Sequence, residues 1–466
     1  APWPEISHLT KTMANYGKVL IERLPLYPRF ALNSKKWTDK EITSALLRSM
    51  DQQGYAREDE WAPGQSTFPP VHKKSYLPLK MKGEKNKIDQ ILDRINGSGE
   101  INEEQIIILL NSRGLEFEQV CEFANKLRKK VSGEEVTYAV NRNINYTNVC
   151  YFRCGFCAFS KGKMSENLRG KPYNLELDEI VSRTREAWDR GASEVCLQGG
   201  IHPSYTGETY LQICKAIHEA VPRIHIHAFS PLEVSQGAST LGLSVPEFLE
   251  KLRDSGLGTL PGTAAEVLDD EVRNIICPDK LSTQEWLSVM RDAHEVGFRT
   301  TATIMFGHLE APYHVARHLL RIRDLQRETG GFTEFVPLPF VHMEAPIYLK
   351  GKSRMGPTFR EAVLIHAVAR IVLNPFIQNI QTSWVKMGPE GVKACLDAGA
   401  NDLGGTLMNE SITRAAGTVH GQEMLPERME ALIRQTGRIP RQRDTLYRIP
   451  DPIQNSKSYG NQLINQ

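Results

Sequence analysis

The sequence lacks an apolar run long enough to cross a bilayer, and its first residues show no charged segment followed by an apolar one. We therefore expect neither a membrane span nor a signal peptide. It also lacks a surplus of charge, with 57 basic against 55 acidic residues. That balance gives no electrostatic footprint for nucleic acid or an anionic membrane, which leaves small molecules as the expected partners.

Cysteine is scarce, with eight in the chain, yet three of them fall at Cys150, Cys154 and Cys157. A closed zinc site needs four ligands, and no histidine or further cysteine lies close enough in sequence to supply the fourth. Three thiolates can instead hold a 4Fe-4S cluster with one open iron. S-adenosylmethionine (SAM) can chelate that iron, and one electron then releases a 5'-deoxyadenosyl radical. The spacing therefore predicts a cluster, SAM and a radical reaction.

The other cysteines stand alone in apolar or helical contexts, where inert core thiols are expected: Cys121, Cys196, Cys214, Cys277 and Cys395. Clustered free thiols fit a reducing compartment, so we expect the protein to be cytoplasmic. Because the chain starts at Ala1 rather than methionine, we expect a processed product or a part of a longer protein.

Composition divides the chain into five segments. Prolines and lysines over residues 63–87 predict a solvated linker. The preceding residues 1–62 contain helical patterns but are too few for a substantial core, so they should pack onto something else. Apolar spacing over 88–132 predicts a helical prelude. We expect a barrel at 133–410 and a C-terminal extension at 411–466.

Short apolar runs alternate with helical segments in the barrel region, which predicts parallel βα units. The eight candidate strands are 136–145, 194–198, 224–229, 258–260, 300–306, 332–336, 377–382 and 401–404. Eight such units favour an α/β fold of the TIM type, a (β/α)8 barrel, with a partial barrel as the alternative.

Polar residues follow several of these strands, where a parallel barrel places its active site. The candidates are Gln198, Gly199, Gly200, Ser230, Glu233, Glu266, Glu334, His342, Gln381 and Asn409. A tight turn is the alternative for the two glycines, a first-turn helix residue for Glu266, and a core role for His225 and His227. We expect residues 437–443 to form a solvated basic face.

The three-cysteine motif, with Phe156 at its aromatic position, resembles the signature of the radical SAM superfamily. Gly199-Gly200 resembles that superfamily's glycine-glycine-glutamate element, although Ile201 replaces the glutamate. The resemblance implies cofactor contacts for Phe156, Gln198, Gly199, Gly200, Ser230, Glu233 and Glu266.

At finer grain the chain resembles the tyrosine-cleaving component of FO synthase from about residue 88 to 450. The motifs that carry this resemblance are Val140–Cys150, Cys157–Ser160, His227–Pro231, Leu260–Glu266, Thr303–His308, Asn401–Gly405 and Gly437–Arg443. Residues 22–28 resemble the end of the other component in fused, two-barrel FO synthases. This chain would then be the second half of such a fusion.

The resemblance implies that the enzyme cleaves L-tyrosine and couples its 4-hydroxybenzyl group to 5-amino-6-(D-ribitylamino)uracil, releasing 2-iminoacetate. It implies two partners, an electron donor and the ring-closing FO synthase component. Glu334, His342, Gln381 and Asn409 would orient the substrates, and Phe229, Phe306 and Phe335 would form an apolar wall. The alternatives are an aminofutalosine synthase of menaquinone biosynthesis and a non-catalytic iron-sulfur or zinc protein.

Overall fold

The computed structural model describes residues 5–70, 86–97, 99–160 and 171–458. Its centre is a parallel sheet of seven strands in the order β2-β3-β4-β5-β6-β7-β8. These are β2 (Asn141–Asn145), β3 (Glu194–Gln198), β4 (His225–Ala228), β5 (Thr259–Leu260), β6 (Arg299–Phe306), β7 (Phe332–Pro339) and β8 (Asn379–Ile380). All neighbours are parallel, so every carboxyl end lies at the same rim.

A second sheet of three strands fills the gap in the ring, in the order β10-β1-β9. Its members are β1 (Glu135–Ala139), β9 (Asp402–Gly405) and β10 (Ile439–Arg443). The predicted first strand, 136–145, is therefore two strands that pair in different sheets. Single bridges join Gln381, just after β8, to Asp402 of β9, and Arg142 of β2 to Met408 in the segment after β9. The fold is thus the predicted barrel in its partial form.

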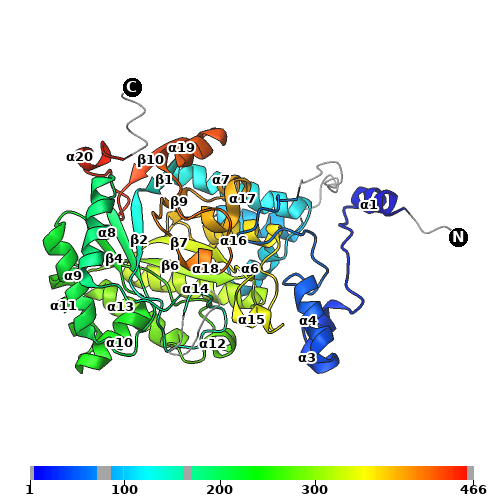
Figure 1. Cartoon of the computed structure of the whole chain (residues 1–466). Coiled ribbons are helices and arrows are strands. Elements are labelled where there is room, and N and C mark those ends of the chain that lie inside the picture. The colour runs from blue at the N-terminus through cyan, green and yellow to red at the C-terminus, as the bar shows by residue number, and fades with distance from the viewer. Residues whose placement is uncertain (1–4, 71–85, 98, 161–170, 459–466) are drawn as a thin grey trace.

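Helices cover the outside of the sheet (Figure 1). Those that alternate with the strands are α8 (Leu177–Asp189), α9 (Gly207–Ala220), α10 (Pro231–Leu241), α11 (Val245–Asp254), α12 (Asp270–Ile276), α13 (Thr283–Glu295), α14 (Pro312–Thr329), α15 (Pro346–Leu349), α16 (Phe359–Leu373) and α17 (Trp384–Asp397). Several of them begin at a capping box, in which a Ser or Thr side chain and a glutamate three residues on satisfy the first backbone N–H groups, as at Ser230, Ser282 and Thr358.

Further helices precede and follow the barrel. Before it lie α5 (Lys87–Asn96), α6 (Glu103–Leu110) and α7 (Leu115–Ser132), and after it α18 (Ile412–Ala415), α19 (Pro426–Gln435) and α20 (Pro452–Asn455). Helix α7 packs against α16 and α6 packs against α14, which places the prelude on the outer surface of the barrel. No helix among the described residues combines the length and the apolar character that a membrane span requires.

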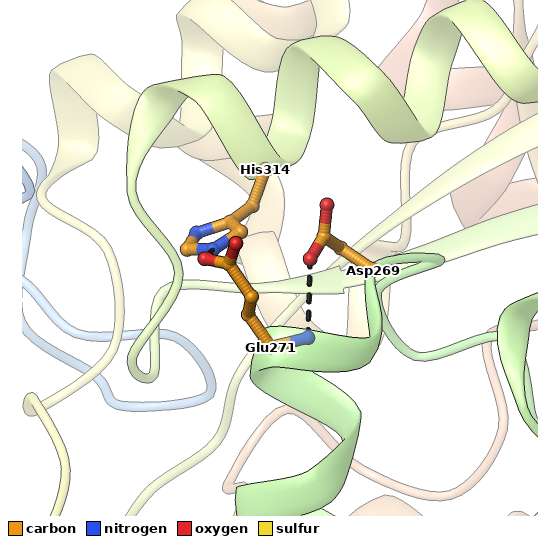
Figure 2. A group of neighbouring side chains, drawn as sticks. All are labelled: Asp269, Glu271 and His314. Atoms are coloured by element: carbon orange, nitrogen blue, oxygen red, sulfur yellow. Dashed lines mark hydrogen bonds and ion pairs between the residues drawn. The ribbon is translucent and has the colours of Figure 1, made fainter.

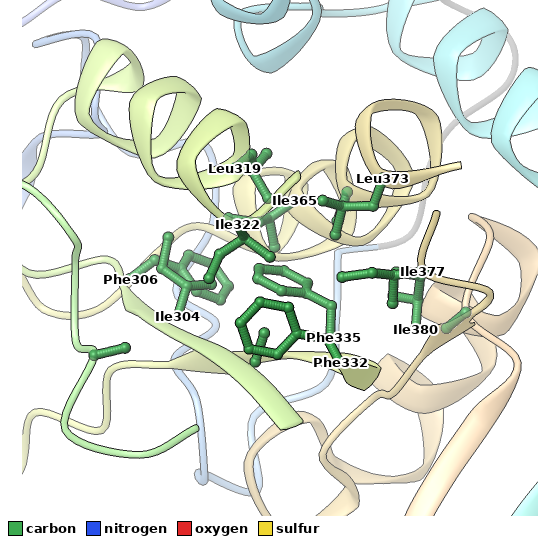
Figure 3. Close-up of a cluster of buried hydrophobic side chains, with 14 of the residues drawn as sticks. Ile304, Phe306, Leu319, Ile322, Phe332, Phe335, Ile365, Leu373, Ile377 and Ile380 are labelled. Atoms are coloured by element: carbon green, nitrogen blue, oxygen red, sulfur yellow. The ribbon is translucent and has the colours of Figure 1, made fainter. Parts of the chain in front are cut away.

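The core lies between the sheet and the outer helices. Figure 3 shows its part at β6 and β7, where Ile304, Phe306 and Phe335 meet Leu319 and Ile322 of α14. Phe306 and Phe335 are at most 3% exposed. Because side chains alternate along a strand, the intervening residues of β6 and β7 point to the inside of the ring.

The front of the chain forms α1 (Ile6–Asn15), α2 (Pro28–Ala31), α3 (Ser34–Trp37) and α4 (Lys40–Ser49), drawn in blue in Figure 1. This part has only a small apolar cluster of its own, made of Leu24, Ala31, Leu46, Leu47 and Met50. Most of the predicted linker at 63–87 lies outside the described residues.

Residues 50–65, here called the strap, join this front part to the barrel. The Trp61 side chain is 2% exposed and packs edge-on against Phe359 of α16, with ring centroids 5.3 Å apart. The backbone N–H of Gln52 donates to the carboxylate of Glu361 (2.7 Å), and Arg57 donates to the carbonyl of Gly356 (2.8 Å). The strap therefore packs as part of the barrel.

Replacement of Trp61 tests this attachment. Trp61→Ala removes a fully buried indole and should lower the free energy of unfolding by about 3–5 kcal/mol, measured by denaturant titration. Trp37→Ala is the matched control, because Trp37 is 55% exposed, and it should change stability far less. Equal effects of the two substitutions would contradict this packing.

Candidate functional site

A cavity of about 410 Å³ opens at the carboxyl ends of the parallel strands. Most of the predicted site residues line it: Cys150, Cys154, Phe156, Cys157, Gln198, Gly199, Gly200, Ser230, Glu233, Glu266, Glu334 and Gln381. These residues come from the exits of β2, β3, β4, β5 and β8 and from β7 itself. The fold thus gathers side chains that are up to about half the chain apart in sequence.

The cysteine loop follows β2 and is held by backbone hydrogen bonds to other loops. The N–H of Gly155 donates to the carbonyl of Ile276 (2.7 Å), and its own carbonyl accepts from the N–H of Ile347 (2.7 Å). The N–H of Ser160 lies 3.3 Å from the Cys157 sulfur. The loop is therefore fixed at the cavity with its thiols free and partly exposed.

The three thiols are not arranged as a preformed site for a single metal ion. Four thiolates around one zinc ion lie about 3.8 Å apart, given a Zn–S distance of about 2.3 Å. Among the described residues, the three cysteine sulfurs do not form a group within 4.8 Å of one another. Burial also raises the pKa of Cys154 to about 12. Such a thiol becomes a stable thiolate only beside a strong cationic partner.

The two glycines at the β3 exit are required by close packing. A β-carbon on Gly200 would lie 2.2 Å from the carbonyl oxygen of Val149 and 2.9 Å from the β-carbon of Cys150. A β-carbon on Gly199 would meet the Tyr146 ring at 2.4 Å. The N–H of Gly200 also donates to the Thr147 carbonyl (2.9 Å). The β3 exit can therefore lie directly against the chain that enters the cysteine loop.

Glu233 is buried at the start of α10. Its carboxylate accepts from the backbone N–H and the hydroxyl of Ser230 (2.7 and 2.6 Å) and from the Tyr146 hydroxyl. Burial raises the pKa of this carboxyl. Glu233 therefore has a structural role as a helix cap, while part of it remains at the cavity wall.

Glu266, at the β5 exit, has a left-handed backbone conformation with φ of +47°. Its carboxylate pairs with the ammonium of Lys280 at 2.9 Å. The Lys280 ammonium also lies over the Phe156 ring, 5.2 Å from the centroid. This pair places a charged, hydrogen-bonding group beside Cys154, close to where a cofactor on the cysteine loop would lie.

The opposite part of the cavity holds a buried ionic group centred on Arg443. Its guanidinium makes two bonds to Asp402 (2.6 and 2.9 Å) and lies 3.3 Å from Glu334. The Tyr447 hydroxyl also donates to Glu334. Burial nevertheless raises the pKa of Glu334 to about 7. The prediction of a solvated face at 437–443 is wrong at Arg443, which is 5% exposed, because the segment forms β10 beside β1.

Two predicted residues do not reach the cavity. His342 follows β7 but packs edge-on against Tyr348, with ring centroids 4.4 Å apart. Asn409 is exposed in a left-handed turn, with φ of +78°. The expected apolar wall of Phe229, Phe306 and Phe335 is also corrected, because all three belong to the core outside the cavity. The apolar lining instead includes Phe152, Phe159, Met305, Val336, Leu338 and Val385.

Sequence reasoning missed the cations of the cavity, Lys280, Lys386 and Arg443. Lys280 and Lys386 stand in no motif, so local sequence gave no signal for them. His227, expected in the interior as an alternative to the core, does line the cavity. Its Nδ1 lies 2.7 Å from the hydroxyl of Thr259, and burial lowers its pKa to about 4.

A separate acidic group lies outside the cavity. The ligand atoms of Asp269, Glu271 and His314 fall within 4.8 Å of one another (Figure 2). Asp269 caps α12 by accepting from the N–H of Glu271, and His314 lies 3.1 Å from the Glu271 carboxylate. Arg317 and Arg321 approach Asp269 at 3.5 and 3.3 Å. Since arginines already compensate the charge, we interpret the group as an ion-pair cluster at two helix starts.

Comparison with known proteins agrees with this geometry. Residues 144–320 match the family model of the radical SAM superfamily, and residues 329–456 match that of the CofH/MqnC C-terminal region. FO synthase of Streptomyces coelicolor is 39% identical over 486 residues, covering 96% of this chain and 56% of its own length. The chain thus spans about half the length of these curated relatives.

A shorter relative is matched almost completely. The 5-amino-6-(D-ribitylamino)uracil--L-tyrosine 4-hydroxyphenyl transferase of Methanocaldococcus jannaschii is 46% identical over 353 residues, which cover 75% of this chain and 97% of that protein. Among solved structures, methylornithine synthase (PylB) aligns with a TM-score of 0.59 at 17% identity, covering 75% of this chain and 97% of its own. At that identity the likeness shows a shared fold alone.

The barrel, the three-cysteine loop and these matches define a radical SAM protein. Within that superfamily, the chain belongs to the family that contains the FO synthases and the Methanocaldococcus 4-hydroxyphenyl transferase.

Substitution of Gly200 tests the packing around the cysteine loop. Gly200→Ala places a methyl group against Val149 and Cys150, which should cost about 1–3 kcal/mol and displace the loop. We expect lower iron and sulfide content after anaerobic reconstitution. Gly97→Ala is the control, because its β-carbon would meet no atom closer than 3.6 Å. Wild-type iron content in Gly200→Ala would contradict the proposed role of this close approach.

The pKa of Glu334 predicts a pH dependence of stability. Because the folded protein holds this proton up to about pH 7, against an ordinary value of 4.5, the free energy of unfolding falls as pH rises between those values. Glu334→Gln should reduce that fall by roughly 2–3 kcal/mol, measured by denaturant titration at pH 5 and pH 8. Glu60 is exposed, so Glu60→Gln serves as the control and should leave the dependence of stability on pH unchanged. Equal slopes in all three proteins would reject the shift.

Proposed function

We propose that this protein cleaves L-tyrosine between Cα and Cβ and couples the 4-hydroxybenzyl fragment to 5-amino-6-(D-ribitylamino)uracil, with release of 2-iminoacetate. The observation that carries this proposal is the 46% identity over 97% of the transferase from Methanocaldococcus jannaschii. The FO synthase relatives favour this reaction over the aminofutalosine synthase alternative.

We assign Cys150, Cys154 and Cys157 to a 4Fe-4S cluster with an open iron for SAM. The match to the radical SAM family and the lack of a compact three-sulfur group among the described residues support this assignment over a zinc site. When bound, the cluster and SAM supply a radical that takes a hydrogen atom from the substrate. We assign SAM contacts to the wall next to the cysteines, which contains Phe156, Gln198, Gly199, Gly200, Ser230, Glu233 and Glu266.

The rest of the cavity would receive the two substrates. Glu334 and Gln381 line it away from the cysteine loop and offer hydrogen bonds to polar substrate groups. Met305, Val336 and Leu338 give an apolar wall that excludes water from a radical. His342 and Asn409 lie outside the cavity, so we assign them no substrate contact.

Hydrogen abstraction and fragmentation leave a 4-hydroxybenzyl radical, which adds to the uracil. The adduct then loses one electron and one proton, so the electron that starts the cycle is matched by one that leaves. We propose an electron donor and the ring-closing FO synthase component, fused or separate, as partners. We place the reaction in the cytoplasm, because reduced thiols require a reducing compartment. The front residues 1–62 would correspond to the end of a preceding unit in the fused relatives.

Product analysis tests the proposal. Anaerobically reconstituted protein, supplied with reductant, SAM, L-tyrosine and the ribitylaminouracil, should form tyrosine-dependent 5'-deoxyadenosine, 2-iminoacetate and the coupled product, detected by mass spectrometry. Cys154→Ala should abolish all three. Cys121→Ala, which removes a thiol of the outer core, should retain them. If wild-type protein forms 5'-deoxyadenosine without any dependence on tyrosine, the proposed substrate is wrong.

A further inference from the structure

The cavity contains one cation whose charge is not compensated by an ion pair within the described residues. Lys280 pairs with Glu266 (2.9 Å), and Arg443 pairs with Asp402 (2.6 Å). Lys386 differs: among the described residues, no carboxylate lies close enough to its ammonium, within 4 Å, to form an ion pair. It therefore differs from the other lysine and the arginine that line the same cavity.

The structure fixes the position of Lys386. It lies in the first turn of α17, directly after β8, and the turn is separated from the rest of the helix by Gly388, with φ of +67°. The carbonyl of Lys386 accepts from the N–H of Gly64 in the strap at 2.7 Å. The neighbouring Ser383 and Val385 also line the cavity. The side chain is thus presented to the cavity by a braced loop.

The surroundings of Lys386 leave its ammonium available. The Glu410 carboxylate acts electrostatically on this ammonium, but it already accepts from the backbone N–H groups of Thr413 (2.7 Å) and Arg414 (3.3 Å) at the start of α18. Burial lowers the pKa of Lys386 to about 8. A partly buried ammonium in this state gains from any anion that enters the cavity.

The position of Lys386 in the ring separates it from the cysteine loop. Cys150 lies against Gly200 after β3, and Cys154 lies near the Glu266–Lys280 pair after β5. In the sheet order β8 is four strands from β4, which lies between those two exits. A carboxylate at Lys386 would therefore belong to a molecule that extends across the cavity from the cysteine loop.

We propose that Lys386 binds the α-carboxylate of the amino-acid substrate. This inference rests on the proposed function. It adds the group by which the protein would select an amino acid over the corresponding amine or amide. The pair orients the Cα–Cβ bond by holding one end of the amino acid on a braced loop. The methionine part of SAM also carries a carboxylate, so the test must distinguish binding of the amino-acid substrate from binding of SAM.

Equilibrium binding to reconstituted protein, without reductant and therefore without turnover, tests the proposal by calorimetry. Lys386→Met should weaken L-tyrosine binding about 10- to 100-fold, as expected for loss of a charged hydrogen bond. Binding of L-tyrosinamide, which has no carboxylate, should change by less than about threefold, within the scatter of substitutions that lose no contact. Lys386→Arg should restore part of the tyrosine affinity, and SAM affinity should stay unchanged.

Lys393→Met is the matched control, since Lys393 lies on the same helix, pairs with Glu390 (2.8 Å) and does not line the cavity. It should bind both ligands like the wild type. Equal losses for tyrosine and tyrosinamide, no loss for either, or a loss confined to SAM would overturn the assignment. If these occur while wild-type protein still forms the coupled product, only the inference fails. If wild-type protein neither binds tyrosine nor forms product, the proposed function fails and the inference with it.

Discussion

The closure of this barrel depends on side-chain charge where backbone pairing is sparse. Between β8 and β9 the ladder is reduced to a single bridge, Gln381 to Asp402. At that seam Arg443 of β10 makes two bonds to Asp402 of β9 and approaches Glu334 of β7. A buried ion pair stabilises a fold only when its geometry is good and its other polar atoms are hydrogen-bonded. The bidentate contact between Arg443 and Asp402 meets that condition. Arg443, Glu334 and Gln381 therefore both close the barrel at this seam and line the cavity.

Side-chain alternation divides the sheet between core and site. On β6, Thr301, Thr303 and Met305 line the cavity, whereas Ile304 and Phe306 face the outer helices. On β7 the register shifts by one residue between the Thr300–Phe332 and Ala302–Phe335 pairs. That extra residue lets both phenylalanines face the helices, although strict alternation would place them on opposite faces.

Much of this architecture could be predicted because its signals are local. The cysteine spacing, the strand runs and the Ser230–Glu233 capping box each involve few neighbouring residues. The errors concern long-range placement. Periodicity marks two faces of a strand but does not say which is inside, so it does not predict that Phe306 and Phe335 face the core outside the cavity. Likewise, Arg443 is buried only because its segment becomes a strand beside β1, which no local pattern indicates.

The strap limits how far the chain can be shortened from its N-terminal side. Residues 50–65 precede both matched family regions, which begin at 144 and 329, yet they bury Trp61 in the barrel and brace the loop of Lys386. An expression boundary drawn at the edge of the recognisable catalytic region would therefore expose Phe359 and release that loop. The packed unit therefore includes the strap from about residue 50, well before the cysteine loop at Cys150.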